Sequence, residues 1–276
     1  MDTFILNAIC QELQPRLCPS TINAFVQPEE YSLVCVLWQQ GTESRLAMSV
    51  DARYQYLFLT DKKPVTSQAQ GDPFAKFLQH HIRGGRIRDI RKPPLERVLT
   101  VDIVKQDIDG QDLRFQLILE LMGRYSNIIL VNVDTNKILE SIRHVTAVHS
   151  SYRRIAPGAV YVPPPPQQEK LALTAIDRPT FQQILEDYAQ AVQETPKLRL
   201  WKFLIQRIGG LSPLLAREVD GRHLDQNDEA RWTRFSRIVE AVKTGSYQPT
   251  VVLEQTDQGM EKPLALSAIP LEQFSY

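Results

Sequence analysis

The chain has 276 residues and a mass of 31.6 kDa, a length that favours two domains of ordinary size. Hydrophobic residues make up 43% of the chain and charged residues 23%, so the composition excludes collagen, a coiled coil and wholesale disorder. The 32 Lys and Arg residues balance 32 Asp and Glu residues, giving zero net charge. Nucleic-acid binding must therefore depend on where the charges lie, because their sum does not favour it.

The first part of the chain alternates helix and strand signals. Apolar residues at helical spacing predict an amphipathic helix over 4–17, and a second helix over 73–82 should stop at Gly84 and Gly85. Asp109-Gly110 predicts a hairpin turn. Runs rich in β-branched and aromatic residues predict antiparallel strands at 31–38, 45–50, 54–59, 86–91, 98–105, 113–122 and 127–132, with 138–145 as a candidate. These elements predict an α+β fold with an antiparallel, β-sandwich-like domain carrying two helices.

Four consecutive prolines, 163–166, predict a stiff extended stretch that separates this domain, residues 1–170, from a second one over 171–276. The second domain is mainly helical and closes with a β-hairpin formed by 250–254 and 263–268. Its predicted helices begin at capping residues or prolines: 181–193 after Thr180, 197–208 after Pro196, 213–219 after Ser212, and one from Asn227 or Asp228 to Thr244.

Basic residues gather in two segments. Between Lys76 and Arg97 there are seven basic residues and two acidic ones, and 196–217 holds five basic residues and no acid, so each segment has a net charge of +5. Local charge density decides phosphate binding, because charges more than about 8 to 10 Å apart are screened at physiological salt. The alternative interpretation is that both segments are ordinary solvated faces of a helix and a strand.

The second basic segment contains a short loop with Gly209, Gly210 and Ser212, set between two predicted helices. Such a loop exposes backbone N–H groups at a helix N-terminus, where an anion is stabilised. This is the layout of a helix-hairpin-helix nucleic-acid motif, although Ser212 replaces the second glycine usual there. An ordinary tight turn between helices is equally consistent with the sequence.

The cysteines Cys10, Cys18 and Cys35 form no CxxC motif and have no histidine at metal-ligand spacing, so we expect buried, reduced thiols and neither a metal nor a cofactor. No basic segment precedes the first apolar residues, and no apolar run approaches the roughly 18 residues of a membrane span. A cytoplasmic protein that does not associate with membranes is expected.

The most distinctive run of the sequence is Glu120-Leu121-Met122-Gly123-Arg124-Tyr125-Ser126-Asn127. It resembles the corresponding segment of the NFACT family, which includes fibronectin-binding protein A and the bacterial and eukaryotic ribosome quality-control factors. Gly84-Gly85-Arg86-Ile87 and Gly210-Leu211-Ser212-Pro213 also fall where that family has them, and the resemblance covers essentially the whole chain. It implies an N-terminal domain related in fold to DNA glycosylases of the formamidopyrimidine type, followed by a helix-hairpin-helix domain.

The resemblance implies a factor that binds the large ribosomal subunit obstructed by peptidyl-tRNA and recruits tRNA, in bacteria alanyl-tRNA, to extend the stalled chain without a template. The older family name implies the alternative of a fibronectin-binding surface adhesin. The fold implies a third, a glycosylase, but those enzymes attack with the amine of an N-terminal proline. This chain begins Met1-Asp2, so we expect no enzymatic activity.

Family positions can be transferred where the motifs match. The family's N-terminal Asp falls on Asp2, its Asp-Arg pair falls on Glu96-Arg97 with a carboxylate one methylene longer, and its Glu-Ile-Met triplet falls on Glu120-Leu121-Met122. We expect these residues to bind tRNA or the ribosome together with Arg86 and Arg124, and we expect Gly209, Gly210 and Ser212 to bind phosphate.

The roles of some of these residues have simpler alternatives. Glu96 and Arg97 are adjacent on a predicted strand and point to opposite faces, so no mutual salt bridge is expected. Gly123 could bend the chain and direct Arg124 outward, or the run could mainly pack Leu121 into the core. His81 and His144 are expected to be packed or hydrogen-bonded rather than catalytic.

Overall fold

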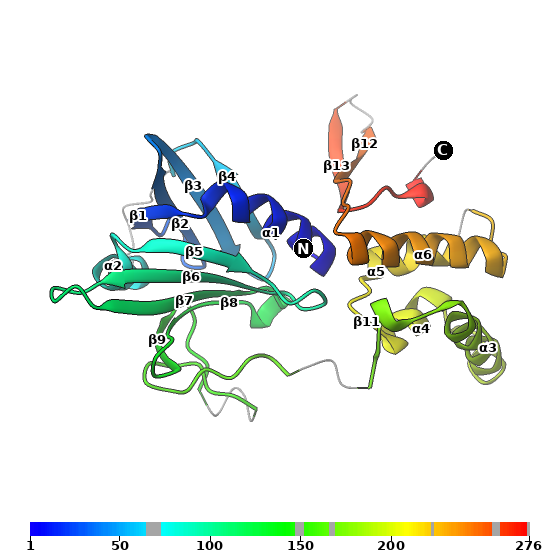
Figure 1. Cartoon of the computed structure of the whole chain (residues 1–276). Helices are drawn as coiled ribbons and strands as arrows, with labels where there is room; N and C mark the ends of the chain where they lie inside the picture. Colours follow the sequence, from blue (N-terminus) through cyan, green and yellow to red (C-terminus); the bar gives the residue numbers. More distant parts are fainter. Residues whose placement is uncertain (65–72, 147–151, 166–168, 222–223, 256–259, 275–276) are drawn as a thin grey trace. The chain divides into compact units, whose positions relative to one another are not determined.

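The computed structural model describes residues 1–64, 73–146, 152–165, 169–221, 224–255 and 260–274 (Figure 1). The chain forms two compact units. The first, here called the sheet unit, comprises Met1, Ile9–Pro93 and Arg97–Pro165. The second, here called the helical unit, comprises Asp2–Ala8, Pro94–Glu96 and Pro166–Tyr276. The domain limits predicted from the sequence, 1–170 and 171–276, did not assign Asp2–Ala8 and Pro94–Glu96 to the second unit.

The sheet unit contains one nine-stranded antiparallel sheet in the order β4-β3-β2-β1-β5-β6-β7-β8-β9. This confirms the α+β class and the predicted antiparallel strands. The strand β1, which pattern reasoning missed, lies near the middle of the sheet. The strands are β1 (Ser20–Val26), β2 (Ser32–Gln39), β3 (Thr42–Val50), β4 (Gln55–Thr60), β5 (Arg86–Arg91), β6 (Val98–Gln106), β7 (Asp112–Glu120), β8 (Asn127–Asn132) and β9 (Lys137–Ser141).

The sheet consists of two halves that meet at β1 and β5. Only two residue pairs join these strands, Ser20 with Ile87 and Thr21 with Arg86. In Figure 1, β2 and β3 run steeply across the view, whereas β5 to β8 run nearly horizontally. The short pairing therefore marks the place where the sheet changes direction.

Two helices accompany the sheet, α1 (Thr3–Leu17) and α2 (Pro73–Ile82). The helix α2 packs against β1 and β9 through buried side chains that include Phe74 and Leu78. It ends at the predicted glycines, because Gly84 has a φ of +79° and a Cβ on Gly85 would lie 2.9 Å from a methyl carbon of Ile103. A cluster of buried apolar residues joins β7, β8 and β9 to Ile155 and is formed by Ile118, Ile129, Val131, Ile138 and Ile155.

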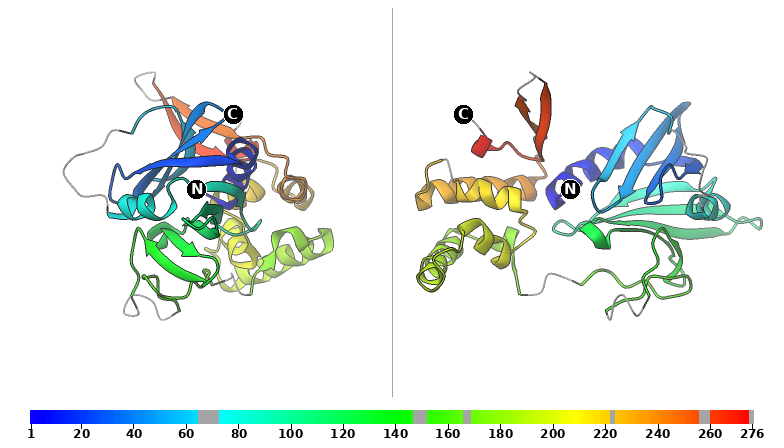
Figure 2. Two further views of the ribbon diagram at one scale, coloured as in Figure 1. Left: turned by 60° about the vertical axis from the view of Figure 1, so that its left-hand side comes forward. Right: turned by 180° about the vertical axis from the view of Figure 1, so that it is seen from behind.

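In its described residues the helical unit contains four complete helices, the first residues of α1 and a β-hairpin, seen from behind on the right of Figure 2. The helices are α3 (Arg178–Glu194), α4 (Leu200–Arg207), α5 (Pro213–Asp220) and α6 (Asp228–Thr244), and the hairpin joins β12 (Thr250–Gln255) to β13 (Glu261–Ser267). Strands β10 (Leu171–Ala172) and β11 (Ile208–Gly209) form a short parallel pair. Three single turns of 3-10 helix complete the elements of the described residues: η1 (Gly123–Tyr125) in the sheet unit, and η2 (Leu173–Ala175) and η3 (Glu272–Phe274) in the helical unit.

The helix starts follow capping chemistry, with two corrections. Ser212 and Asn227 cap α5 and α6 as predicted, each accepting a hydrogen bond from a backbone N–H three residues on. The predicted cap of α3 was wrong, because Asp177 accepts the hydrogen bond from the backbone N–H of Thr180. The helix α4 begins at Leu200 rather than at residue 197. None of the helices in the described ranges is long and apolar enough to cross a membrane.

Candidate functional site

The helical unit displays an exposed group of cations on and beside α4 and α5, here called the α4–α5 cluster: Lys197, Arg199, Lys202, Arg207 and Arg217. None of the five forms an ion pair with a residue that the structure describes, whereas elsewhere in the unit Arg178 pairs with Glu229. The indole of Trp201 holds two of them together, because the Arg217 guanidinium lies 4.5 Å and the Lys202 Nζ 5.5 Å from its ring centre. Positive charge without an ion-pair partner among the described residues is thus concentrated on and beside α4 and α5.

The loop between α4 and α5 has a carboxylate at its helix N-terminus. The Ser212 hydroxyl caps α5 and donates a 2.9 Å hydrogen bond to Oδ2 of Asp2. Oδ1 of the same carboxylate accepts hydrogen bonds from the backbone N–H groups of Phe4 and Ile5, at 3.0 and 2.9 Å. Asp2 therefore joins the first turns of α1 and α5, and its charge lies where an anion is favoured.

The two glycines of this loop have structural tasks. Gly210 has a φ of +84°, and a Cβ there would lie 3.0 Å from a methyl carbon of Leu95. Gly209 is buried and pairs with Ala172 in the β10–β11 pair. Both glycines are thus required by the backbone path and by close packing. Their predicted role in phosphate binding stays a prediction.

Glu96 and Arg97 precede β6, and they fall in different units. The backbone carbonyl of Glu96 accepts a 2.9 Å hydrogen bond from the Thr3 hydroxyl, and its side chain is half-buried. Arg97 is exposed, and no described residue forms an ion pair with it. Both residues lie in a bend rather than on the predicted strand, and no ion pair joins their side chains among the described residues.

Glu120 is buried in the sheet unit and paired. Its two carboxylate oxygens accept hydrogen bonds from the Arg153 guanidinium at 2.7 and 2.5 Å, and Oε1 also accepts one from the Tyr161 hydroxyl at 3.0 Å. Burial, followed by the charge of Glu120, raises the pKa of Tyr161 above its ordinary value. Leu121 is fully buried as well. The side chains of Glu120 and Leu121 therefore face the interior, where they fix the end of β7.

The chain then turns outward. Gly123 has a φ of +60° and opens η1, and Ser126 Oγ accepts the backbone N–H of Met122 at 2.8 Å. Gln55 donates to Ser126 Oγ at 2.6 Å and to the Gly123 carbonyl at 3.1 Å, so β4 also holds the turn. Both interpretations of this run are correct: Leu121 packs in the core, and the bend leaves Arg124 exposed, with its guanidinium 4.7 Å from the Tyr125 ring centre.

Two predicted basic residues lie at the same end of the sheet, and the third lies at the opposite end. The backbone N–H of Leu121 donates to the Arg97 carbonyl at 2.9 Å, which places Arg97 beside the Met122–Arg124 turn. Arg86 pairs with Val104 at the far end of β6. Arg97 and Val104 are seven positions apart along the chain, which corresponds to about 23 Å at about 3.3 Å per residue of strand. The predicted site residues of the sheet unit therefore form two groups.

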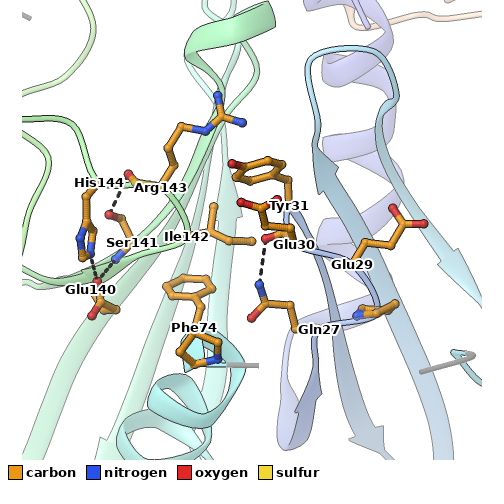
Figure 3. Close-up of a pocket in the computed structure, with 12 residues that line it drawn as sticks. Gln27, Glu29, Glu30, Tyr31, Phe74, Glu140, Ser141, Ile142, Arg143 and His144 are labelled. Atoms are coloured by element: carbon orange, nitrogen blue, oxygen red, sulfur yellow. Dashed lines mark hydrogen bonds and ion pairs between the residues drawn. The ribbon is translucent and has the colours of Figure 1, made fainter. Parts of the chain in front are cut away.

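A cavity of about 510 Å³ in the sheet unit was not expected from the sequence (Figure 3). Figure 3 shows Arg143 beside Tyr31, and its guanidinium lies 4.2 Å from the ring centre. His144 is hydrogen-bonded to Glu140. The lining residues come from three distant segments, 27–31, 73–74 and 140–144, so no local sequence signal could have revealed the cavity.

The second histidine considered in the sequence is also engaged. His81 Nδ1 lies 2.9 Å from the Phe77 carbonyl oxygen, and its ring stacks on Phe77 at 3.9 Å between ring centres. The expectation that His81 and His144 are packed or hydrogen-bonded is confirmed.

Comparison with known proteins places the chain in a family. A family model described as the NFACT N-terminal and middle domains matches residues 2–276. The chain belongs to the NFACT family. It is 30% identical over 181 residues to the Rqc2 homolog RqcH of Streptococcus pneumoniae, which covers 66% of this chain and 33% of that protein. RqcH of Bacillus subtilis is 28% identical over 222 residues, covering 79% of this chain and 36% of that protein. The chain thus spans about a third of the length of these curated relatives.

Solved structures share the fold of this NFACT chain. The fibrinogen binding protein from Staphylococcus aureus matches with a TM-score of 0.78 and 24% identity, covering 100% of this chain and 92% of the other. The N-terminal part of the fibronectin/fibrinogen-binding protein from Streptococcus suis matches with a TM-score of 0.74 and 25% identity, with the same coverage. The likeness to the first of these supports the fold alone.

Proposed function

We propose that this chain provides RNA-binding surfaces of a ribosome-associated quality-control factor. Such a factor binds the obstructed large ribosomal subunit and tRNA, in bacteria alanyl-tRNA, and supports template-independent C-terminal tailing of stalled nascent chains. The RqcH relatives and the family membership support this role. The observation that carries the proposal is the α4–α5 cluster, which has five exposed cations without described ion-pair partners in a chain of zero net charge.

Physical chemistry favours RNA as the partner of this cluster. A cation that already forms an ion pair gains little from a phosphate, whereas an unpaired one releases a counterion from the RNA when it binds. Arginine adds bidentate geometry toward phosphate oxygens. The contact of Arg217 and Lys202 with Trp201 pre-orders two of the cations, which lowers the entropy lost on binding.

In this proposal the predicted site residues divide into two kinds. Arg97, Met122 and Arg124 contact RNA at one end of the sheet, where both arginines are exposed. Asp2 and Glu120 act indirectly, by holding the backbone in place. Asp2 joins the first turns of two helices, and Glu120 holds the end of β7. The α4–turn–α5 segment acts as a helix-hairpin-helix, and the sheet unit derives from the glycosylase-like fold.

The proposal includes no covalent chemistry by this chain, and the ribosome supplies peptidyl transfer in the cytoplasm. Borohydride trapping on abasic DNA tests this directly, and a covalent adduct would contradict the assignment.

The experiment that tests the proposal is cosedimentation of the protein with purified large subunits, with and without peptidyl-tRNA, combined with tRNA binding by filter assay. Lys202→Gln with Arg217→Gln should weaken RNA binding. Arg178→Gln is the control, because this exposed arginine on the same unit already pairs with Glu229. Equal binding by the cluster variant and the wild type would remove the cluster from the interface.

A fibronectin-binding adhesin is the second candidate, and the descriptions of the solved neighbours as fibronectin- or fibrinogen-binding proteins favour it. The same basic surface would then meet a protein rather than RNA. Pull-down of fibronectin at physiological salt, together with detection of the protein on intact cells, decides between the two functions. Retention of fibronectin without tRNA binding would select the adhesin.

A further inference from the structure

A groove of about 480 Å³ lies at the end of β5, β6 and β7 that is remote from Arg97. Arg86 and Arg88 of β5 line it together with Lys105 of β6 and Asp112 of β7. No aromatic side chain is among the described residues that line it. The groove therefore offers charge and hydrogen-bond donors, but no surface on which a base could stack.

The sequence of β5 directs the two arginines to the groove. Ile87 and Ile90 are both buried although they lie three residues apart, and in a regular strand they would face opposite sides. The register shifts between Ile87 and Asp89, which pair with Ile103 and Asp102. This bulge adds Arg88 as an extra residue and keeps both isoleucines in the core. Arg86 and Arg88 remain exposed.

The guanidinium groups of Arg86 and Arg88 form no ion pair or hydrogen bond with the part of the chain that the structure describes. Other arginines of the strands at the groove are neutralised. Arg91 of β5 donates to Asp102 at 2.6 and 3.1 Å, and Arg114 of β7 pairs with Asp134. Arg86 and Arg88 are therefore positive charges at the groove that remain available to a ligand.

The other charged groups at the groove are partly occupied. Lys105 Nζ donates a 2.9 Å hydrogen bond to the carbonyl of His81, so it neutralises the negative C-terminal end of α2 beside the groove. Asp112 is the acidic residue of the lining and opposes an anion. Asp107, farther along the β6–β7 hairpin, accepts hydrogen bonds from the backbone N–H groups of Asp109 and Gln111.

We propose that this groove binds the phosphodiester backbone of RNA and is a second contact, about 23 Å along the sheet from Arg97. The inference rests on the proposed function and extends it, because it assigns a separate site and a sequence-independent mode of recognition. The two unpaired guanidinium groups, separated in the chain by Ile87, contact neighbouring phosphates. Because the described lining has no stacking surface, the groove does not recognise base identity.

The test compares two double variants that remove the same charge from the sheet unit. Arg86→Gln with Arg88→Gln removes the unpaired groove arginines, and Arg91→Gln with Arg114→Gln removes two paired ones. The dissociation constant for a transcribed tRNA is measured from about 50 to 200 mM salt. The groove variant should bind several-fold more weakly, with a salt slope smaller by about 1.4 to 1.8, which is two phosphates at 0.7 to 0.9 each. The control should keep the wild-type slope.

Each outcome decides the matter. Equal losses in both double variants would show a net-charge effect and overturn the groove site, as would unchanged binding by the groove variant. Asp112→Asn should tighten binding, since it removes the acid of the lining. If the groove variant lost heparin binding but retained tRNA binding, the ligand would be a sulfated polysaccharide and the proposal would be overturned. If the wild type itself shows no salt-dependent tRNA binding, the proposed function fails; if only the groove variant behaves as wild type, the groove alone fails.

Discussion

Replacing Glu120 by alanine should destabilise the sheet unit and is the sharpest structural test of how the Glu120-Leu121-Met122 run works. The carboxylate is fully buried and receives two hydrogen bonds from Arg153, whose side chain is 9% exposed, and one from Tyr161. Removing one partner of a buried ion pair leaves the other charge uncompensated and costs about 3 to 5 kcal/mol. That loss is a large part of the roughly 5 to 15 kcal/mol by which domains are stable.

Urea unfolding followed by circular dichroism in the β-sheet region measures this loss. The matched control is Glu120→Leu with Arg153→Met, which removes both charges and should recover most of the stability, because an apolar pair of similar volume can replace a buried ion pair. A Glu120→Ala protein within about 0.5 kcal/mol of the wild type would refute the reasoning. So would a double variant no more stable than the single one.

Three further outcomes are expected. Arg97→Ala should weaken tRNA binding by roughly 1 to 3 kcal/mol in a filter assay if its contact is bidentate, and unchanged affinity would remove Arg97 from the interface. Asp2→Ala should lower the free energy of unfolding by about 0.5 to 2 kcal/mol, because α1 loses its cap and Ser212 loses an acceptor; an unchanged urea midpoint would contradict this role. Burial raises the pKa of the Cys18 thiol to about 11, so its reaction with a disulfide reagent at pH 8 should be on the order of 100-fold slower than that of a free thiol and should increase with pH; a plateau below pH 9 would contradict the shift.

Local chemistry allowed most elements to be predicted. The glycines after α2, the Ser212 cap of α5 and the Asp109-Gly110 turn each follow from the backbone conformation that their residues favour. The strand β1 was missed because Ser20–Val26 mixes Ser, Thr, Asn and Ala with few strongly strand-forming residues. Its place in the sheet comes from pairing with β2 and β5, which no local pattern contains.

The site was less predictable than the fold, because its contacts join residues that are far apart in the chain. Glu120 meets Arg153 across 33 positions, and Asp2 meets Ser212 across 210 positions. Sequence reasoning singled out Glu120, Asp2 and Ser212, yet it could not distinguish residues that contact a ligand from residues that hold the backbone. Whether an arginine is free or already neutralised depends on such pairings, and the contrast between Arg88 and Arg91 shows this within one strand.

The central claim is that a chain without net charge binds RNA through basic groups that its fold leaves unpaired. The most direct measurement is the affinity of the wild-type protein for tRNA as a function of salt concentration. If about six phosphates are neutralised, the account predicts that log K falls with log salt with a slope of about 4 to 5 in magnitude. A slope near zero, or no saturable binding at low salt, would contradict it.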